Sequence, residues 1–229
     1  MMSVGQTLSL LVLTLLSYWA GCRLHRCVPH VLMSPVFTST LLVIGALYLT
    51  HTDYQTYQVA NQPLSWLLGP AQVAMALPLF KGWTLLKKHV SSVLTVVFAG
   101  TSSGVLTAAL AGKLLHLSSE TTLSLIPKSA TTPIAMVTSQ SLGGTPELTA
   151  IFAVLTGIIG VAAGPVFLRW MGVQSRLLKG LALGTAGQML GAARASKWGD
   201  AAAAMGIVGM SLTAMLIGLV TPYLLPILL

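Results

Sequence analysis

Charged residues are scarce in this sequence. Only 7% of the 229 residues are Asp, Glu, Lys or Arg, whereas about 25% is usual in a soluble domain. Acidic residues are the scarcest, with four Asp and Glu against twelve Lys and Arg. Apolar residues make up 55% of the chain, and the mean hydropathy is +0.84. This composition excludes a disordered tail, a coiled coil and an ordinary soluble enzyme, and it predicts an integral membrane protein.

Several motifs that carry catalysis or metal binding are also missing. The sequence has no HExxH, no CxxC and no Walker loop, and its five His residues are scattered. None of the four acids lies inside an apolar stretch, so a buried triad and a proton-coupling carboxylate both lack their acid. Cys22 and Cys27 do not have the spacing of metal ligands. We therefore expect no enzyme activity, no metal and no cofactor.

Long charge-free stretches predict transmembrane helices. Each approaches or exceeds the roughly 20 residues that a helix needs to cross the hydrocarbon core, and none alternates as a barrel strand would. Six spans are predicted, at residues 6–22, 31–50, 65–80, 89–112, 148–168 and 201–226. Residues 1–229 are expected to form a single membrane domain, with N-terminal helices in 1–112 and two unusual segments in 113–229.

The two unusual segments, residues 118–144 and 179–196, are apolar but interrupted. If both crossed the membrane, Arg169, Arg176 and Lys179 would lie outside, against the positive-inside rule. If both are re-entrant, 10 of the 12 basic residues lie in the cytoplasm, so the basic surplus marks a membrane face and predicts no nucleic-acid partner. We expect the first segment to enter from outside and the second from inside, meeting near the midplane as in many secondary transporters. The alternative is seven or eight full spans.

The first interrupted segment contains a polar stretch between Pro127 and Pro133. Proline breaks a helix and frees backbone groups, and irregular backbone at membrane depth survives where it is buried or lines a wet cavity. An ionisable group there indicates function, although Lys128 could instead snorkel to the surface. Four residues of the stretch have donor side chains: Lys128, Ser129, Thr131 and Thr132.

The second interrupted segment is periodic. Its glycines are spaced by four, three and four residues, which places them on one helical face that another backbone could approach. Arg194 falls on that face, where it could bind a ligand or contact lipid headgroups. The glycines are Gly180, Gly184, Gly187 and Gly191, and Thr185, Gln188 and Ala192 form a neighbouring stripe.

Three stretches carry a resemblance to a known family. They are KSATTPIAM at 128–136 followed by Gly143 and Gly144, GLALGTA at 180–186 followed by Gly191 and by ARA at 193–195, and LGPA at 68–71 followed by ALPL at 76–79. Together they resemble the signatures of the LrgB/CidB membrane proteins, from about Trp66 to the C-terminus. Pro70 and Pro78 belong to the third stretch, and we expect them to be structural, as are Pro127, Pro133 and the four glycines.

The resemblance implies a multi-pass protein of the bacterial inner membrane. The family is described as antiholin-like, controlling murein hydrolase export and cell lysis, often with a small LrgA/CidA-type partner. Its plant relatives are plastidic glycolate/glycerate translocators, and bacterial members are linked to pyruvate movement. The family usually has Ser-His where this chain has Gly187-Gln188, and Thr where it has Ala192, so a histidine-based proton step is not expected.

Two functions are compatible with these observations. Transport is favoured because a carboxylate-binding site needs a fixed cation within the membrane, and Lys128 and Arg194 supply it. The protein is then a secondary transporter or facilitator of small carboxylates such as glycolate or pyruvate. The alternative is an antiholin-like regulator that acts through assembly. The lipid bilayer, a small organic acid anion, an LrgA/CidA-type protein and further copies of this chain are the expected partners. The expected substrate-binding residues are Lys128, Ser129, Thr131, Thr132, Thr185, Gln188 and Arg194.

Overall fold

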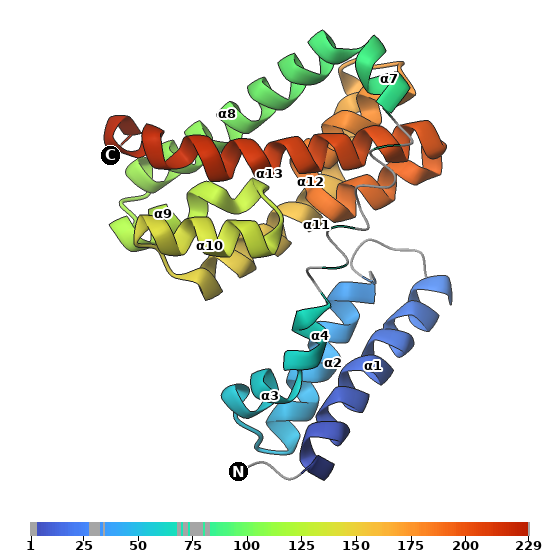
Figure 1. Cartoon of the computed structure of the whole chain (residues 1–229), viewed down its shortest axis with the longest axis vertical. Helices are drawn as coiled ribbons and strands as arrows, with labels where there is room; N and C mark the ends of the chain where they lie inside the picture. The colour runs from blue at the N-terminus through green and yellow to red at the C-terminus, as the bar shows by residue number, and fades with distance from the viewer. Residues whose placement is uncertain are drawn as a thin grey trace. The chain divides into compact units, whose positions relative to one another are not determined.

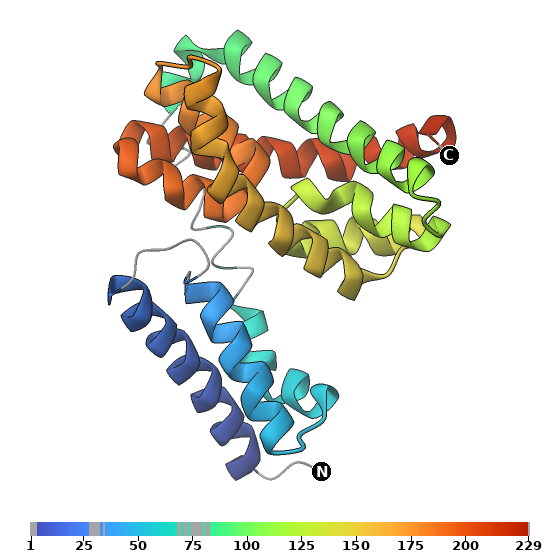
Figure 2. The same ribbon diagram turned by 180° about the vertical axis from the view of Figure 1, so that it is seen from behind.

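The computed structural model describes residues 4–27, 33, 35–67, 70, 73, 80 and 83–228. Every regular element among these residues is a helix (Figures 1 and 2), which confirms the all-α class. Four of the described helices are long and apolar enough to cross a membrane: Gly5–Cys27, Val90–Leu114, Pro146–Trp170 and Asp200–Thr221. The chain divides into two compact units, Met1–Ala74 and Met75–Leu229.

Unit 1 is built on two apolar helices that lie side by side (Figures 1 and 2). They approach closely at Gly21, where a Cβ atom would lie 2.8 Å from the Pro35 carbonyl oxygen. A polar contact joins the first helix to the third, since Thr14 Oγ1 donates to Asn61 Oδ1 at 2.9 Å. The helices are α1 (Val4–Cys27), α2 (Pro35–Leu49), α3 (Tyr54–Ala60) and α4 (Gln62–Trp66).

Helix α1 covers the predicted span 6–22 and extends beyond both of its ends, and helix α2 lies within the predicted span 31–50. The predicted span 65–80 lies mostly outside the described residues, and so does Pro78. Pro70 is described only as an isolated residue.

Unit 2 contains three long helices and two interrupted segments between them (Figure 1). The longest helix, α13, packs near its start against α12 and farther along against α10, where Ala214 and Ile217 join Ala130 and Ala135 in a buried cluster. The elements are α7 (Trp83–Lys88), α8 (Val90–Leu114), α9 (Ser119–Leu125), the 3-10 turn η2 (Ile126–Ser129), α10 (Thr132–Leu142), α11 (Pro146–Trp170), α12 (Arg176–Ala195), η3 (Ser196–Trp198) and α13 (Asp200–Leu228).

The first interrupted segment folds as a hairpin. Pro127 lies in η2, and Pro133 stands in the first turn of α10, where its missing N–H leaves no helical hydrogen bond unmade. Helix α10 ends at Gly143, whose φ of 87° is the left-handed conformation that glycine adopts freely. The two ends of the segment then meet, because the Thr145 N–H donates to Ser124 Oγ at 2.8 Å. Within unit 2 the chain therefore enters and leaves at the same end, as a re-entrant segment does.

The second interrupted segment also reverses direction. Helix α12 is broken at Gln188, whose φ of 53° and ψ of −135° are not helical. After this turn the chain packs back on itself, so that a Cβ atom at Gly191 would overlap the Leu183 carbonyl oxygen. In Figure 1 this hairpin lies at the end of unit 2 that holds α7, and the α9–α10 hairpin lies at the other end. Two hairpins thus enter unit 2 from opposite ends.

The prediction of one continuous glycine face is wrong. Gly180 and Gly184 face the backbone of α13, at Ala202 and Gly206, whereas Gly187 faces α11. Gly191 meets the earlier half of its own segment. The physical reason is the turn at Gln188, since a spacing of four, three and four defines one face only while the helix is continuous.

Candidate functional site

The tips of the two hairpins touch in the interior of unit 2. The Gln188 side-chain amide donates to the Lys128 carbonyl oxygen at 2.7 Å and lies 3.4 Å from the Ala153 carbonyl oxygen of α11. Gln188 is only 6% exposed, so both contacts are shielded from solvent. One side chain therefore ties the η2 tip, the α12 tip and α11 together, and the predicted meeting of the two segments is confirmed.

Lys128 extends its side chain across to α8. Its Nζ donates to the Gly104 carbonyl oxygen at 2.8 Å, and the residue is half-buried. No Asp or Glu in the described part of the chain forms an ion pair with it. An ammonium group has three donors, so two N–H groups remain for a ligand. This geometry argues against snorkelling, because the charged group is held between two elements of the fold.

A cavity of about 300 Å³ lies beside Lys128. Two glycines of α8 lie on its wall and let neighbouring side chains approach closely: a Cβ at Gly100 would lie 2.8 Å from Thr185 Cγ2, and one at Gly104 would lie 3.2 Å from Ser129 Oγ. The wall therefore combines one cation, several hydroxyl groups and small residues. The cavity is lined by Val96, Gly100, Ser103, Gly104, Thr107, Lys128, Ser129, Thr156, Ala182, Thr185 and Ala186.

The hydroxyl groups of the wall differ in what they can offer a ligand. Thr185 Oγ1 donates to the Leu181 carbonyl oxygen at 2.9 Å, so it can only accept a further hydrogen bond. Thr107 and Ser103 likewise donate to carbonyl oxygens within α8. Within the described residues, the hydroxyls of Ser129 and Thr156 make no hydrogen bond. These two can both donate and accept.

The remaining predicted site residues lie outside the cavity wall. Thr131 is the N-cap of α10 and Thr132 is its first residue, directly after the 3-10 turn that carries Lys128. Gln188 lies behind the wall, bonded to the Lys128 backbone. Arg194 lies at the other end of its hairpin, with its Cζ atom 5.6 Å from the centre of the Trp198 ring. The structure thus brings Lys128, Ser129 and Thr185 together and leaves Arg194 apart from them.

Sequence reasoning missed the contribution of α8. Gly100 and Gly104 are four residues apart and are separated by three hydroxyl residues. Such a small-xxx-small pattern inside an apolar span signals close backbone approach. Thr156 of α11 carries no comparable signal, since single Thr residues are common in membrane helices.

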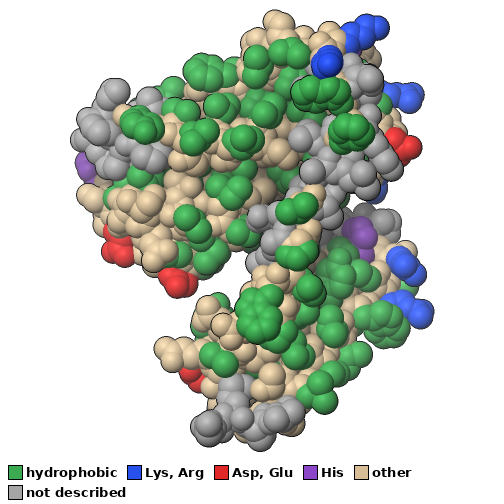
Figure 3. All heavy atoms as spheres, in the orientation of Figure 1, with side chains coloured by type: hydrophobic (Ala, Val, Ile, Leu, Met, Phe, Trp, Pro, Cys, Tyr) green, Lys and Arg blue, Asp and Glu red, His purple; other side chains and the backbone are tan. Residues whose placement is uncertain are grey.

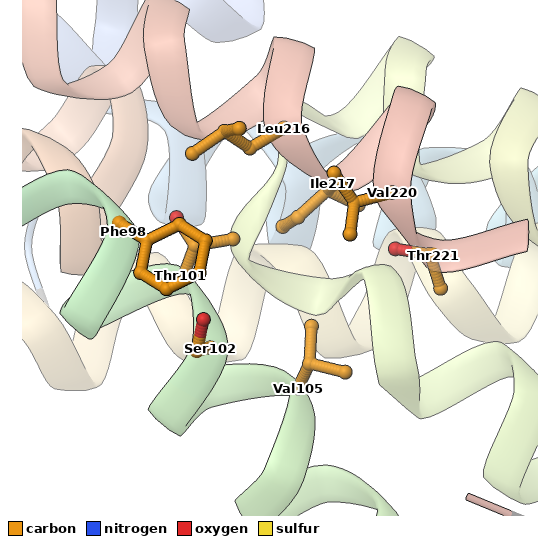
Figure 4. Close-up of a pocket in the computed structure, with 8 residues that line it drawn as sticks. All are labelled: Phe98, Thr101, Ser102, Val105, Leu216, Ile217, Val220 and Thr221. Atoms are coloured by element: carbon orange, nitrogen blue, oxygen red, sulfur yellow. The ribbon is translucent and has the colours of Figure 1, made fainter. Parts of the chain in front are cut away.

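A second, smaller pocket lies between α8 and α13 (Figure 4). The hydroxyls of Thr101 and Thr221, which are on its wall, are buried without a hydrogen-bond partner in the described structure. Its volume of about 20 Å³ admits one water molecule. It is too small for an organic anion, and the Lys128 cavity is the better candidate site.

Long apolar helices, with two interrupted segments that meet between them, define an all-helical membrane protein. The chain belongs to the LrgB-like family, whose sequence profile matches residues 14–227. It is 36% identical over 207 residues to the uncharacterized protein YxaC of Bacillus subtilis (strain 168), covering 90% of each chain. It is 33% identical over 215 residues to the uncharacterized protein YwbG of the same organism, covering 94% of this chain and 96% of the relative. No solved structure matches the chain.

Proposed function

We propose that this protein is a secondary transporter or facilitator that moves small carboxylates across the bacterial inner membrane. One observation carries the proposal: a lysine without an acidic partner is fixed at the joined tips of two hairpins and lines a cavity. An unpaired ammonium group at depth is costly unless an anion pairs with it. A small carboxylate supplies that charge.

Different residues in and around the cavity would bind different parts of the substrate. The Lys128 ammonium group would bind the carboxylate, and a hydrogen bond to a charged group is worth about 1.5–3 kcal/mol. The N-terminus of α10, which follows at Thr132, would add partial positive charge. The hydroxyls of Ser129 and Thr156 would bind a hydroxyl or keto oxygen of the substrate. Gln188 would position Lys128 rather than touch the substrate, because its amide already holds the Lys128 carbonyl.

The charge distribution supports an orientation for this transporter. Lys87, Lys88, Arg169 and Arg176 lie at the end of unit 2 where the α12 hairpin begins. By the positive-inside rule this end would face the cytoplasm. The α9–α10 hairpin would then open to the outside, and each hairpin would close one access path to Lys128.

Uptake of radiolabelled monocarboxylates into proteoliposomes tests the proposal. Lys128→Met should lower uptake about 10–100-fold, since the lost hydrogen bonds to a charged group are worth about 1.5–3 kcal/mol. Ser129→Ala should lower it less, roughly fivefold, since neutral hydrogen bonds are worth nearer 1 kcal/mol. Lys113→Met is the matched control, because Lys113 is exposed in the last turn of α8 and does not line the cavity.

Three outcomes would count against the proposal. If Lys128→Met transports as well as wild type, the cavity is not the substrate site. If Arg194→Gln abolishes uptake while Lys128→Met does not, the cation that binds the substrate is Arg194, beside Trp198, and not Lys128. If the wild-type protein moves none of the acids, transport of carboxylates is refuted, and the effect of the protein on murein hydrolase release becomes the function to measure.

A further inference from the structure

Two cations share one aromatic ring at the end of unit 2. Lys179 Nζ lies 5.8 Å and Arg194 Cζ lies 5.6 Å from the centre of the Trp198 ring. Lys179 is near the start of α12 and Arg194 is near its end, so the turn at Gln188 is what brings them together. Their charges are no farther apart than the sum of these two distances, and they repel each other.

Among the described residues, no acidic side chain forms an ion pair with either cation. Asp200 is the nearest acid in sequence, yet within the described residues neither cation forms an ion pair or a side-chain hydrogen bond. Glu120 and Glu147 belong to α9 and to the first turn of α11, at the opposite end of unit 2. Both cations are half-buried, so solvent screens them less than it would screen exposed charges. Two half-buried positive charges therefore lie near one ring, and neither is neutralised by an ion pair within the described residues.

The surroundings of the pair indicate which anion fits. Figure 3 shows basic side chains gathered at the α7 end of unit 2. Trp198 lies just before the apolar helix α13, and Trp170 is the last residue of the apolar helix α11. Tryptophan at the ends of spanning helices is typical of the headgroup region of a bilayer. The exposed basic residues at this end include Lys87, Lys88, Arg169, Arg176 and Lys197.

We propose that Lys179, Arg194 and Trp198 form a binding site for the headgroup of an anionic phospholipid such as phosphatidylglycerol. The phosphate lies between the two cations, where the Arg194 guanidinium can donate two parallel hydrogen bonds to its oxygens. The Trp198 ring lies against the first acyl carbons, which are apolar. A lipid fits better than a free anion because the site combines two charges with an aromatic face at the end of apolar helices. The site is separate from the Lys128 cavity and does not depend on what the cavity binds.

Native mass spectrometry of the full chain in detergent tests the site. The purified protein is titrated with phosphatidylglycerol and, in parallel, with phosphatidylcholine of the same acyl chains. Each cation that contacts the phosphate is expected to be worth about 1 kcal/mol, or about fivefold in affinity, and a cation farther from the phosphate contributes less. The double variant Lys179→Gln, Arg194→Gln should therefore bind phosphatidylglycerol about 25-fold more weakly. The matched control is Arg176→Gln, Lys197→Gln, which removes the same charge from the same end and should weaken binding less than fivefold.

Several results would overturn the proposal. Equal losses in the two double variants would mean that the general positive field attracts lipid and no local site exists. Equal binding of phosphatidylcholine would mean that the acyl chains alone are recognised. Full competition by inorganic phosphate at the lipid's own concentration would mean that the site takes free phosphate. If the double variant does not fold, the single variants Lys179→Gln and Arg194→Gln decide, because each should weaken phosphatidylglycerol binding about fivefold.

Discussion

Two neighbouring glycines of α12 differ in the space that the structure leaves for an added methyl group. A Cβ atom at Gly184 would overlap the carbonyl oxygen of Gly206 in α13, so the two backbones are in direct contact there. A Cβ atom at Gly187 would meet its nearest atoms, in Gly157 and Gly160 of α11, at 3.7 Å, which is an ordinary contact. Gly184→Ala is therefore expected to destabilise the protein strongly, and Gly187→Ala is not.

The difference in stability between the two variants depends on which atoms must move to admit the added methyl group. At Gly184 the opposing atom is backbone, which cannot rotate away, so α12 and α13 must separate. Their separation opens the buried cluster that includes Leu181, Met205 and Val208. Overpacking typically costs about 1–3 kcal/mol, and a backbone contact places this case near 3 kcal/mol. At Gly187 the methyl group fits, and alanine in a helix is favoured over glycine by roughly 0.5–1 kcal/mol.

Unfolding of the purified full chain, followed by far-UV circular dichroism as detergent micelles are titrated with SDS, measures both variants. The unfolding free energies should differ by about 3 kcal/mol, because the helix term applies to both variants and only the overpacking term separates them. Gly45→Ala is the control for the helix term alone, because a Cβ at this position of α2 has nothing within 4 Å. Equal stability of the Gly184 and Gly187 variants would refute the α12–α13 contact and restore the single glycine face.

Two further predictions concern the hairpins. Gln188→Leu should destabilise the protein by about 1–2 kcal/mol, because the Lys128 and Ala153 carbonyl oxygens lose their shared donor; an unchanged unfolding curve in the same SDS titration would show that the tips do not hold each other. In a background without Cys22 and Cys27, single cysteines at Thr52 and Thr145 should react with an impermeant thiol reagent from outside, and ones at Lys87 and Gln174 from inside. Labelling of Thr145 and Gln174 on the reverse sides would mean that the 118–144 segment crosses the membrane.

The polar residues of the first hairpin were predictable because they break local rules. A lysine and several hydroxyl residues between two prolines have no place in a plain apolar span, so the sequence predicted an interruption and a site there. The structure places Lys128 and Ser129 on a cavity wall, and their role in binding a substrate stays a prediction. The same logic did not find Gly100 and Gly104, because glycine is frequent in membrane helices and its partner is visible only in three dimensions.

The prediction for α12 was partly wrong because periodicity assumes a continuous helix. Nothing in the side-chain pattern of residues 180–194 marks a reversal at Gln188, a residue with φ of 53° that is not glycine. The Gln188 side chain is held by tertiary contacts, since its amide donates to two carbonyl oxygens from other elements. Because the chain reverses at Gln188, Arg194 lies near Trp198, whose ring also contacts Lys179, and not near Lys128.

The sequence by itself determined the all-helical membrane class, the two interruptions and the cation at the first of them, because composition, hydropathy and proline act locally. The tertiary structure alone decided which residues face each other. Close contacts of Gly184 with Gly206 and of Gln188 with Lys128 join residues 22 and 60 positions apart. Such contacts depend on the direction in which each hairpin returns, and that direction is fixed by packing between whole elements and not by any local stretch of residues.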